Sequence, residues 1–372
     1  MRFVYFTHSL VSDWNHGNAH FLRGILRELQ RRGHETRVFE PANGWSRANL
    51  LASHGGAAVA RFSTRFPGLT STAYAAEGFD VEAAVEGADV VIVHEWNEPW
   101  LVAALGRHRR RDGRYLLLFH DTHHRAATAP HELDRFDLSG YDGVLAFGEA
   151  IREIYLRRGW ARRVWTWHEA ADSALFRPHP EIEREGDLVW VGNWGDGERT
   201  AELETFLLAP IRALRLRARV YGVRYPVEAL AALQQAGIGY GDWLANDLVP
   251  EAFARHRLTV HVPRGPYARS LPGIPTIRMF EALACGIPLV SAPWEDSEGL
   301  FRPGRDFLFA RNQAAMAEAL RHLLAEPLAA AELATNGLET IRARHTCAHR
   351  VEELLSICAA QGKREATTNA AA

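Results

Sequence analysis

The stretch GIPTIRMFEALACGIPLVSA, residues 273–292, carries the pattern on which the predicted fold depends. Proline suits the first helical position, where its missing N–H costs nothing, so Pro275 is expected to begin a helix, and Gly286 is expected to end it. The apolar run 287–292 that follows is typical of a buried parallel strand. A helix followed at once by a buried strand indicates an α/β fold built on a parallel sheet.

The same helix brings two charged residues together. Arg278 and Glu281 are three residues apart, so they share one helical face, while Ile277 falls on the apolar face. The backbone N–H groups of Thr276 and Ile277 at the helix start favour an anion. An anion site, a cation and a carboxylate in this order match the diphosphate and ribose of a sugar nucleotide. An exposed ion pair without a ligand is the alternative.

Strand and helix signals alternate through both halves of the chain, which predicts two parallel sheets covered by helices. The helix NAHFLRGILRELQRRGH is expected to end near Gly33. The stretch 43–72 leaves helix and loop both open. The predicted strands are RFVYF, ETRVFE, ADVVIVHEW, GRYLLLFHD and YDGVLAFG in the first half, and DLVWVGNW, RARVYGV, LTVHVPRG and the run 287–292 in the second. The other predicted helices are AELETFLLAPIRALRL, VEALAALQQAG, PEAFARHR and three between residues 313 and 360.

Length and composition predict a two-domain globular protein. The chain has 372 residues, of which 47% are hydrophobic and 24% charged, and single cores rarely exceed about 250 residues. We expect a first Rossmann-like domain over 1–165, a polar linker over 166–186 and a second Rossmann-like domain over 187–345. A last helix is expected over 346–360, and a disordered tail over 361–372.

Charge, cysteine content and hydropathy exclude several classes of function. The formal net charge of −2 gives no sign of a nucleic-acid partner. Three cysteines in no motif indicate a reducing compartment, and we find neither a signal peptide nor a membrane-spanning run. We therefore expect a cytoplasmic protein. The basic runs 107–114 and 157–163 are solvated helix ends or, alternatively, contacts with anionic lipid at the inner face of the membrane.

Polar residues follow the predicted strands of the first half, where ligands bind in parallel sheets. The segment 7–18 ends in His16, Gly17 and Asn18, which precede a helix and allow its backbone to approach an acceptor or phosphate. His94 ends another strand. The absence of G-x-G-x-x-G argues against a dinucleotide cofactor, and we expect no cofactor.

The cluster HDTHHR, residues 120–125, raises the question of a metal. Its spacing fits no zinc motif, so we expect none. A strand-end histidine, His120, that contacts substrate beside Asp121 is one interpretation. A rim histidine bonded to the backbone is the other.

Three segments resemble a known family: AADSALFRP (170–178), the opening stretch with its P-x-x-R-x-F-E pattern, and GLFRPGRDFLFARN (299–312). The sequence resembles GT-B glycosyltransferases of the group-1 (family 4-like) kind. Its second half is most similar to the branch of spore-maturation CgeB-like proteins. In the first half the resemblance rests on Gly17, on His120 and Asp121, and on the domain order.

The resemblance implies roles for individual residues. Glu281 would bind the ribose of a nucleoside diphosphate sugar, and the backbone at Thr276 and Ile277 would hold its diphosphate. Arg199 and, more weakly, Arg264 match basic phosphate ligands, and Arg278 would join them. His120 matches a histidine that reaches the transferred sugar. One departure is Gly273, where many relatives carry a glutamate eight residues before Glu281.

The resemblance also implies a mechanism. Two Rossmann-like domains would face each other across a cleft, the first binding the acceptor and the second the donor, and the last helix would cross back to the first domain. The enzyme would transfer a hexose without a metal to an unidentified small molecule, lipid or glycan. If it inverts, the base is among His16, His94, Glu95 and Asp121. A sugar-nucleotide epimerase and a non-catalytic sugar-nucleotide-binding protein are the alternatives.

Overall fold

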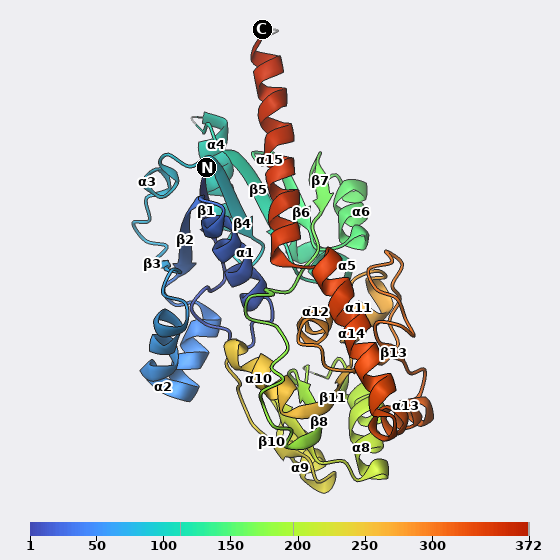
Figure 1. Ribbon diagram of the computed structural model, residues 1–372. Helices are drawn as coiled ribbons and strands as arrows, with labels where there is room; N and C mark the ends of the chain where they lie inside the picture. Colours follow the sequence, from blue (N-terminus) through green and yellow to red (C-terminus); the bar gives the residue numbers. More distant parts are fainter. Residues whose placement is uncertain (112, 196, 371–372) are drawn as a thin grey trace. The chain divides into compact units, whose positions relative to one another are not determined.

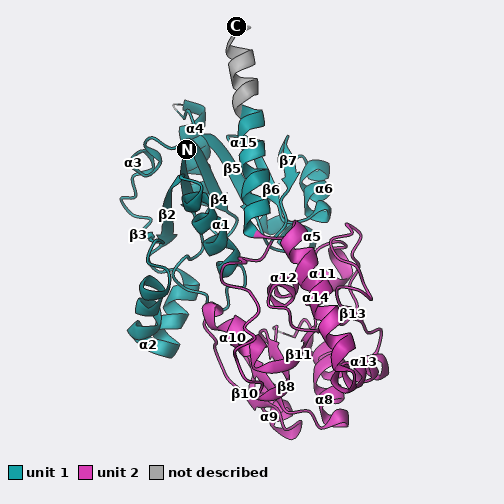
Figure 2. Ribbon diagram, viewed as in Figure 1, with its two compact units in different colours: residues 1–169, 347–372 teal, residues 170–346 magenta. Residues whose placement is uncertain are grey.

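The computed structural model describes residues 1–111, 113–195 and 197–370, with side chains described as far as Gln361 (Figure 1). The chain divides into two compact units, as Figure 2 shows. Unit 1 comprises Met1–Glu169 and Cys347–Ala372, and unit 2 comprises Ala170–Thr346.

A seven-stranded parallel sheet forms the centre of unit 1, in the order β3-β2-β1-β4-β5-β6-β7. Every residue of β4 is buried, as expected for a strand with both faces covered. The strand order reverses direction between β1 and β4, where open α/β sheets bind ligands. The strands are β1 Arg2–Phe6, β2 Glu35–Pro41, β3 Thr72–Tyr74, β4 Val90–His94, β5 Leu116–Asp121, β6 Gly143–Ala146 and β7 Val164–Thr166.

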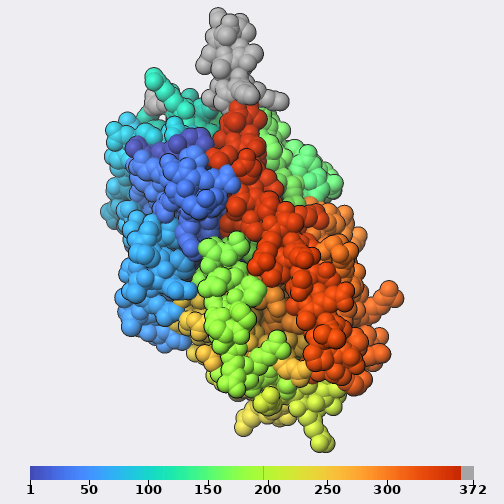
Figure 3. Space-filling view, in the orientation of Figure 1, coloured from blue at the N-terminus to red at the C-terminus, as the bar shows by residue number. Residues whose placement is uncertain are grey.

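Helices flank this sheet. They are α1 Ala19–Arg31, α2 Trp45–Arg65, α3 Val81–Val85, α4 Pro99–Arg111, α5 Arg125–Thr128, the short η1 Pro130–Glu132, α6 Glu149–Arg158 and α15 Cys347–Ala370. The last of them, α15, packs along α1, and Figure 3 shows its red surface beside the blue surface of the first helix. The Trp167 indole N–H donates to the carbonyl of Arg350 over 2.9 Å and fastens α15 to the end of β7.

Unit 2 contains a six-stranded parallel sheet in the order β10-β9-β8-β11-β12-β13, and its order reverses between β8 and β11. The strands are β8 Gly186–Val191, β9 Ala218–Tyr221, β10 Gly239–Tyr240, β11 His256–His261, β12 Leu289–Ser291 and β13 Leu308–Phe309. The helices are α7 Thr200–Leu203, the π-helix η2 Glu204–Leu208, α8 Ala209–Leu214, α9 Val227–Gln235, η3 Asn246–Leu248, α10 Val249–Ala254, α11 Gly265–Ser270, α12 Ile277–Ala284, α13 Gln313–Ala325 and α14 Pro327–Arg344.

Two parallel α/β sheets confirm the predicted fold class, with local differences. The opening helix begins at Ile277 with Thr276 as its N-cap, so placing Pro275 at the first helical position was wrong by two residues. Gly286 adopts φ +64° just past the helix, which confirms it as the stop. The helix expected over 201–216 is split by η2.

For the stretch 43–72, the sequence leaves helix and loop both open. Residues 45–65 form α2, whose two parts meet at Gly55 with φ +74°. The first part of the stretch is therefore helical, and β3 begins where it ends, at Thr72. Apart from Gln361, the tail predicted to be disordered, 361–372, lies outside the residues whose side chains are described.

Candidate functional site

Two buried charges shape the loop after β1 in unit 1. Glu40 Oε2 accepts hydrogen bonds from the Ser9 hydroxyl at 3.1 Å and from the Leu10 backbone N–H at 2.6 Å. Arg23 of α1 donates from Nε to the Leu10 carbonyl at 3.0 Å and from NH1 to the Asp13 carboxylate at 2.9 Å. The sequence places neither Arg23 nor Glu40 in the site, yet both position the loop that carries His16.

The loop after β1 ends at the start of α1. The backbone N–H of His16 donates to the carbonyl of Asp13, and Asn18 accepts from the N–H of Leu22 in the first turn of α1. Gly17 is exposed between them. Burial and nearby charges hold the pKa of His16 well below its usual value, so its imidazole is neutral.

Two histidines contact each other at the ends of β4 and β5. His120 Nδ1 lies 3.2 Å from His94 Nε2, and His94 Nδ1 lies 3.4 Å from the hydroxyl of Thr7. Burial lowers the pKa of His94 to about 3 and that of His120 as well, so both are neutral. Among the described residues, the buried Nε2 of His120 has no hydrogen-bond partner.

Two buried carboxyl groups lie beside these histidines. Glu95, 0% exposed, accepts from the Thr122 hydroxyl at 3.1 Å, and Asp121 accepts from the Tyr155 hydroxyl at 2.8 Å. Burial raises the pKa of both carboxyls, and the charge of Asp121 raises that of Glu95 further. The Arg125 guanidinium opposes both shifts. The edge of this sheet can therefore retain a proton on a carboxyl group near neutral pH.

In unit 2, Arg199 lies at the ends of β8 and β11. Its NH1 donates to the carbonyl of Val262 at 2.9 Å, its NH2 donates to the carbonyl of Asn193, and its guanidinium lies over the Trp190 ring. The Nε of Arg199 is buried and has no hydrogen-bond partner in the described part of the chain. The two carbonyl groups that hold the guanidinium of Arg199 therefore do not engage its Nε–H donor.

Two further arginines lie close enough to act on Arg199. Burial and the charges of Arg264 and Arg278 lower the pKa of Arg199 to about 9. Arg264 lies 3.5 Å from the Glu198 carboxylate, and Arg278 forms an ion pair with Glu281. Three guanidinium groups at one sheet edge create a positive potential that favours a polyanion.

Glu281 is fully buried, with 0% of its surface exposed. Its Oε1 accepts from the Asn246 side-chain amide at 3.2 Å, and its Oε2 pairs with Arg278. The alternative of an exposed pair is therefore wrong, because Glu281 is buried and only 19% of the Arg278 side chain is exposed. The role of the pair in binding a ligand stays a prediction. Glu281 and Arg278 do lie together, as their spacing predicted.

The start of α12 is held by a histidine that sequence reasoning missed. His261, the last residue of β11, has Nδ1 2.9 Å from the Ser291 hydroxyl and Nε2 3.0 Å from the Thr276 hydroxyl. It thereby positions Thr276 and Ile277, where we expect diphosphate to bind. A histidine ending the apolar run LTVH was the signal that could have revealed it.

Gly273 has a backbone that explains the missing glutamate. Its φ is +85°, and a Cβ placed there would lie 2.5 Å from Cγ of Glu298. Most side chains at this position would therefore be strained, and the Glu298 side chain occupies the adjacent space.

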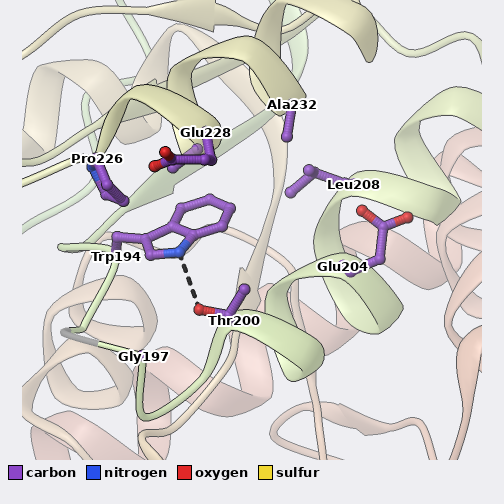
Figure 4. Close-up of a pocket in the computed structure, with 9 residues that line it drawn as sticks. Trp194, Gly197, Thr200, Glu204, Leu208, Pro226, Glu228 and Ala232 are labelled. Atoms are coloured by element: carbon purple, nitrogen blue, oxygen red, sulfur yellow. Dashed lines mark hydrogen bonds between the residues drawn. The ribbon is translucent and has the colours of Figure 1, made fainter.

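A separate cavity of about 480 Å³ lies beside the loop that carries Arg199 (Figure 4). The Trp194 indole N–H donates to the Thr200 hydroxyl at 3.0 Å on one side, as the dashed line shows. Leu208, Ala229 and Ala232 supply apolar surface.

Metal and membrane features are few. In the described residues, no group of three or more His, Cys, Asp or Glu is placed to hold a metal ion. No helix of the described chain is long and apolar enough to cross a membrane. In the basic runs, Arg109 pairs with Asp142, and the Trp160 indole N–H donates to Asp134.

The fold and two family models indicate the class of protein. Two parallel-sheet Rossmann-like units give the chain the GT-B fold of glycosyltransferases. The family model described as "Glycosyltransferase Family 4" matches residues 17–175, and that described as "Glycosyl transferase-like" matches residues 199–356. Together they support a group-1 glycosyltransferase. A comparison with curated protein sequences gave no match.

Several solved structures share the fold. HepE of Anabaena, in complex with UDP and glucose, is 14% identical, with a TM-score of 0.67 over 96% of this chain and 99% of that chain. An α-glucosyltransferase bound to UDP and DNA is 12% identical, with a TM-score of 0.69 over 96% of this chain and 99% of that chain. Sucrose-phosphate synthase from Thermosynechococcus elongatus is 15% identical, with a TM-score of 0.63 over 100% of both chains. At such identities these likenesses show the fold alone.

Proposed function

We propose that the protein transfers a hexose from a nucleoside diphosphate sugar to an acceptor. The observation that carries this proposal is the set of arginines at one edge of the second sheet, Arg199, Arg264 and Arg278, beside the start of α12. A diphosphate leaving group carries the charge that such a cluster stabilises, both in binding and in the transition state. The UDP complexes of HepE and of the α-glucosyltransferase support a nucleotide donor for this fold.

In unit 2 we assign the donor. Arg199 and Arg278, with Arg264 in support, would bind the diphosphate together with the backbone of Thr276 and Ile277. Glu281 would accept from the ribose hydroxyls. Its pairing with Arg278 and Asn246 holds the carboxylate in one orientation before ligand arrives, which reduces the entropy lost on binding.

In unit 1 we assign the acceptor and two reacting groups. His120 carries a buried acceptor or donor atom, Nε2, which suits a hydroxyl group. Asp121 is held by Tyr155 and can exchange a proton. His16, Gly17 and Asn18 line the loop ahead of α1. Transfer would proceed by positioning and charge stabilisation, with protein groups in place of a metal.

The decisive experiment is calorimetry with UDP, GDP, ADP and TDP on the full chain. At least one should bind, and Glu281→Gln should weaken that binding by about 10- to 150-fold, which corresponds to a charged hydrogen bond of about 1.5–3 kcal/mol. Glu318→Gln, an exposed residue of α13, is the matched control and should bind as the wild type does. Failure of all four nucleotides to bind, or unchanged affinity in Glu281→Gln, would contradict the donor site.

Activity separates the alternatives. Transfer requires an acceptor, whereas an epimerase would convert the sugar nucleotide alone and a binding protein would leave it intact. His120→Ala should lower turnover and leave nucleoside diphosphate affinity unchanged. Peripheral contact with anionic lipid and membership of the CgeB-like branch stay predictions, the first testable by vesicle sedimentation.

A further inference from the structure

A group of aromatic rings lies at the carboxyl edge of the first sheet, and the assignments above use only one of its members, His16. His8, just after β1, lies at its centre. The centroid of the His8 ring is 5.5 Å from that of Trp96, which follows β4, and 6.5 Å from that of Trp45, the first residue of α2. His16 lies 5.1 Å from His8. We call these four residues the indole–imidazole band.

Two further aromatic rings, those of Trp14 and His123, pack against the indoles of the band. The Trp14 ring meets Trp45 edge to face at 5.1 Å, and His123 meets Trp96 edge to face at 4.9 Å. Gly44 lets the start of α2 approach the loop after β1 closely, because a Cβ at this position would lie 3.2 Å from the carbonyl oxygen of Pro41 and 3.3 Å from that of His8. The two exposed indoles are thereby held in place.

Both indoles stay open to solvent. Trp45 is 45% exposed and Trp96 is 39% exposed, although each has rings packed against it. Exposed tryptophans that lie together on one face are typical of binding surfaces. The position at the strand ends, where parallel sheets bind ligands, agrees with this.

The charge of the band is nearly neutral. Burial and the charge of Arg125 lower the pKa of His8 to about 4, so the imidazole both donates and accepts hydrogen bonds at neutral pH. The Arg125 guanidinium lies over the Trp96 ring at 4.2 Å, and its NH1 donates to the Glu132 carboxylate at 3.3 Å. The Glu132 carboxylate therefore offsets part of the charge that Arg125 brings to the band.

We propose that this band binds a saccharide as the acceptor, with a sugar ring stacked on Trp96 or Trp45 and its hydroxyls bonded to His8 and His16. A pyranose has an apolar C–H face, whose hydrogens are attracted to the negative face of an indole. Its rim of hydroxyls needs neutral groups that donate and accept, which the two imidazoles supply. The role of this saccharide as acceptor rests on the proposed function, whereas the binding of a saccharide to the band does not.

The test is binding without any donor. Oligosaccharides of glucose, galactose, mannose, N-acetylglucosamine and rhamnose are screened against the full chain by saturation-transfer NMR. We expect at least one to bind, with its ring protons receiving the saturation. Trp96→Ala and Trp45→Ala should each weaken that binding by about tenfold or more, and Trp96→Phe, which keeps an aromatic face, should weaken it less.

Trp100→Ala is the matched control. Trp100 is 36% exposed, and its ring contacts are with Tyr74 and Phe79, outside the band. It should bind saccharide as the wild type does. Far-ultraviolet circular dichroism of each variant establishes that the fold is retained, and Trp96→Phe serves as the test if the alanine variant does not fold.

Several outcomes would overturn the proposal. They are absence of binding by every oligosaccharide, equal binding by the wild type and both alanine variants, and Trp96-dependent binding of single-stranded DNA or anionic vesicles in place of sugar. UDP affinity, measured on the same samples, reports the donor site independently. Sugar binding without nucleotide binding would refute the donor assignment alone, and the reverse would refute this one alone.

Discussion

Arg23→Met removes a buried guanidinium and should destabilise unit 1 more than any exposed arginine does. The Arg23 side chain donates to two carbonyls, those of Leu10 and Val11, each at 3.0 Å, and to the Asp13 carboxylate at 2.9 Å. The guanidinium also lies over the rings of Phe62 and Phe66. Methionine fills much of the volume but donates nothing.

The loss of stability in Arg23→Met follows from the acceptor groups that no longer have this donor. Two carbonyls and one carboxylate lose this donor in a largely buried region, and breaking a buried pair in this way costs about 3–5 kcal/mol. The hydrogen bonds are not additive, so three bonds do not triple the cost of one. Arg23→Lys, which keeps the charge as a single point donor, should lose less than Arg23→Met.

Native-state hydrogen exchange is the suitable assay, because two units need not unfold as one. Amides of α1 and of the segment 9–13 should exchange faster in Arg23→Met, and those of β8 and β11 in unit 2 should not change. Arg27→Met, one turn along α1 and partly exposed, is the control. A loss of stability no larger than that of Arg27→Met would refute the role assigned to Arg23.

Three further predictions concern unit 2 and catalysis. Activity should survive EDTA, because protein cations are assigned to the diphosphate; loss of activity that Mg²⁺ or Mn²⁺ restores would contradict this. Gly273→Ala should cost about 1–2 kcal/mol from its φ of +85° alone, and Gly304→Ala, at φ +83° in open space, is the control that isolates the collision with Glu298 in thermal unfolding. Burial lowers the pKa of His261 from 6.5 to about 3 in the folded protein. Between these two pH values only the unfolded chain binds the proton, so the free energy of unfolding falls as the pH falls. His261→Gln should therefore show a shallower acid loss in urea titrations at pH 4 to 7, by up to about 1.4 kcal/mol per pH unit; equal slopes would exclude this coupling.

The sequence predicted the elements better than it predicted their partners. Apolar runs such as VVIV and LLLF identify buried strands without reference to anything distant, since period and composition are local. The same locality explains the pair Arg278 and Glu281, which one helix brings together. It does not fix the start of α12, because Pro275, of a type that prefers the first helical position, here precedes the N-cap Thr276.

Groups held by distant contacts escaped prediction. Glu40 and the loop it fixes are about thirty residues apart in sequence, and His261 meets Thr276 from another strand. The burial of Glu281 could not be predicted either, because its spacing from Arg278 does not indicate that none of its surface is exposed. The indole–imidazole band combines three separate strand-end segments, which only the sheet order brings together.

The chain passes through unit 2 before it completes unit 1. The first 169 residues lack α15, which packs on α1 and is joined to it by an ion pair between Arg32 and Glu352. On the ribosome, therefore, the face of α1 that contacts α15 stays uncovered until residue 347 and those after it have been made, while unit 2 is one unbroken segment that can fold as it emerges. During translation, unit 2 can therefore be complete while unit 1 still lacks α15. A nascent chain stalled at this stage is the form to which a chaperone would bind.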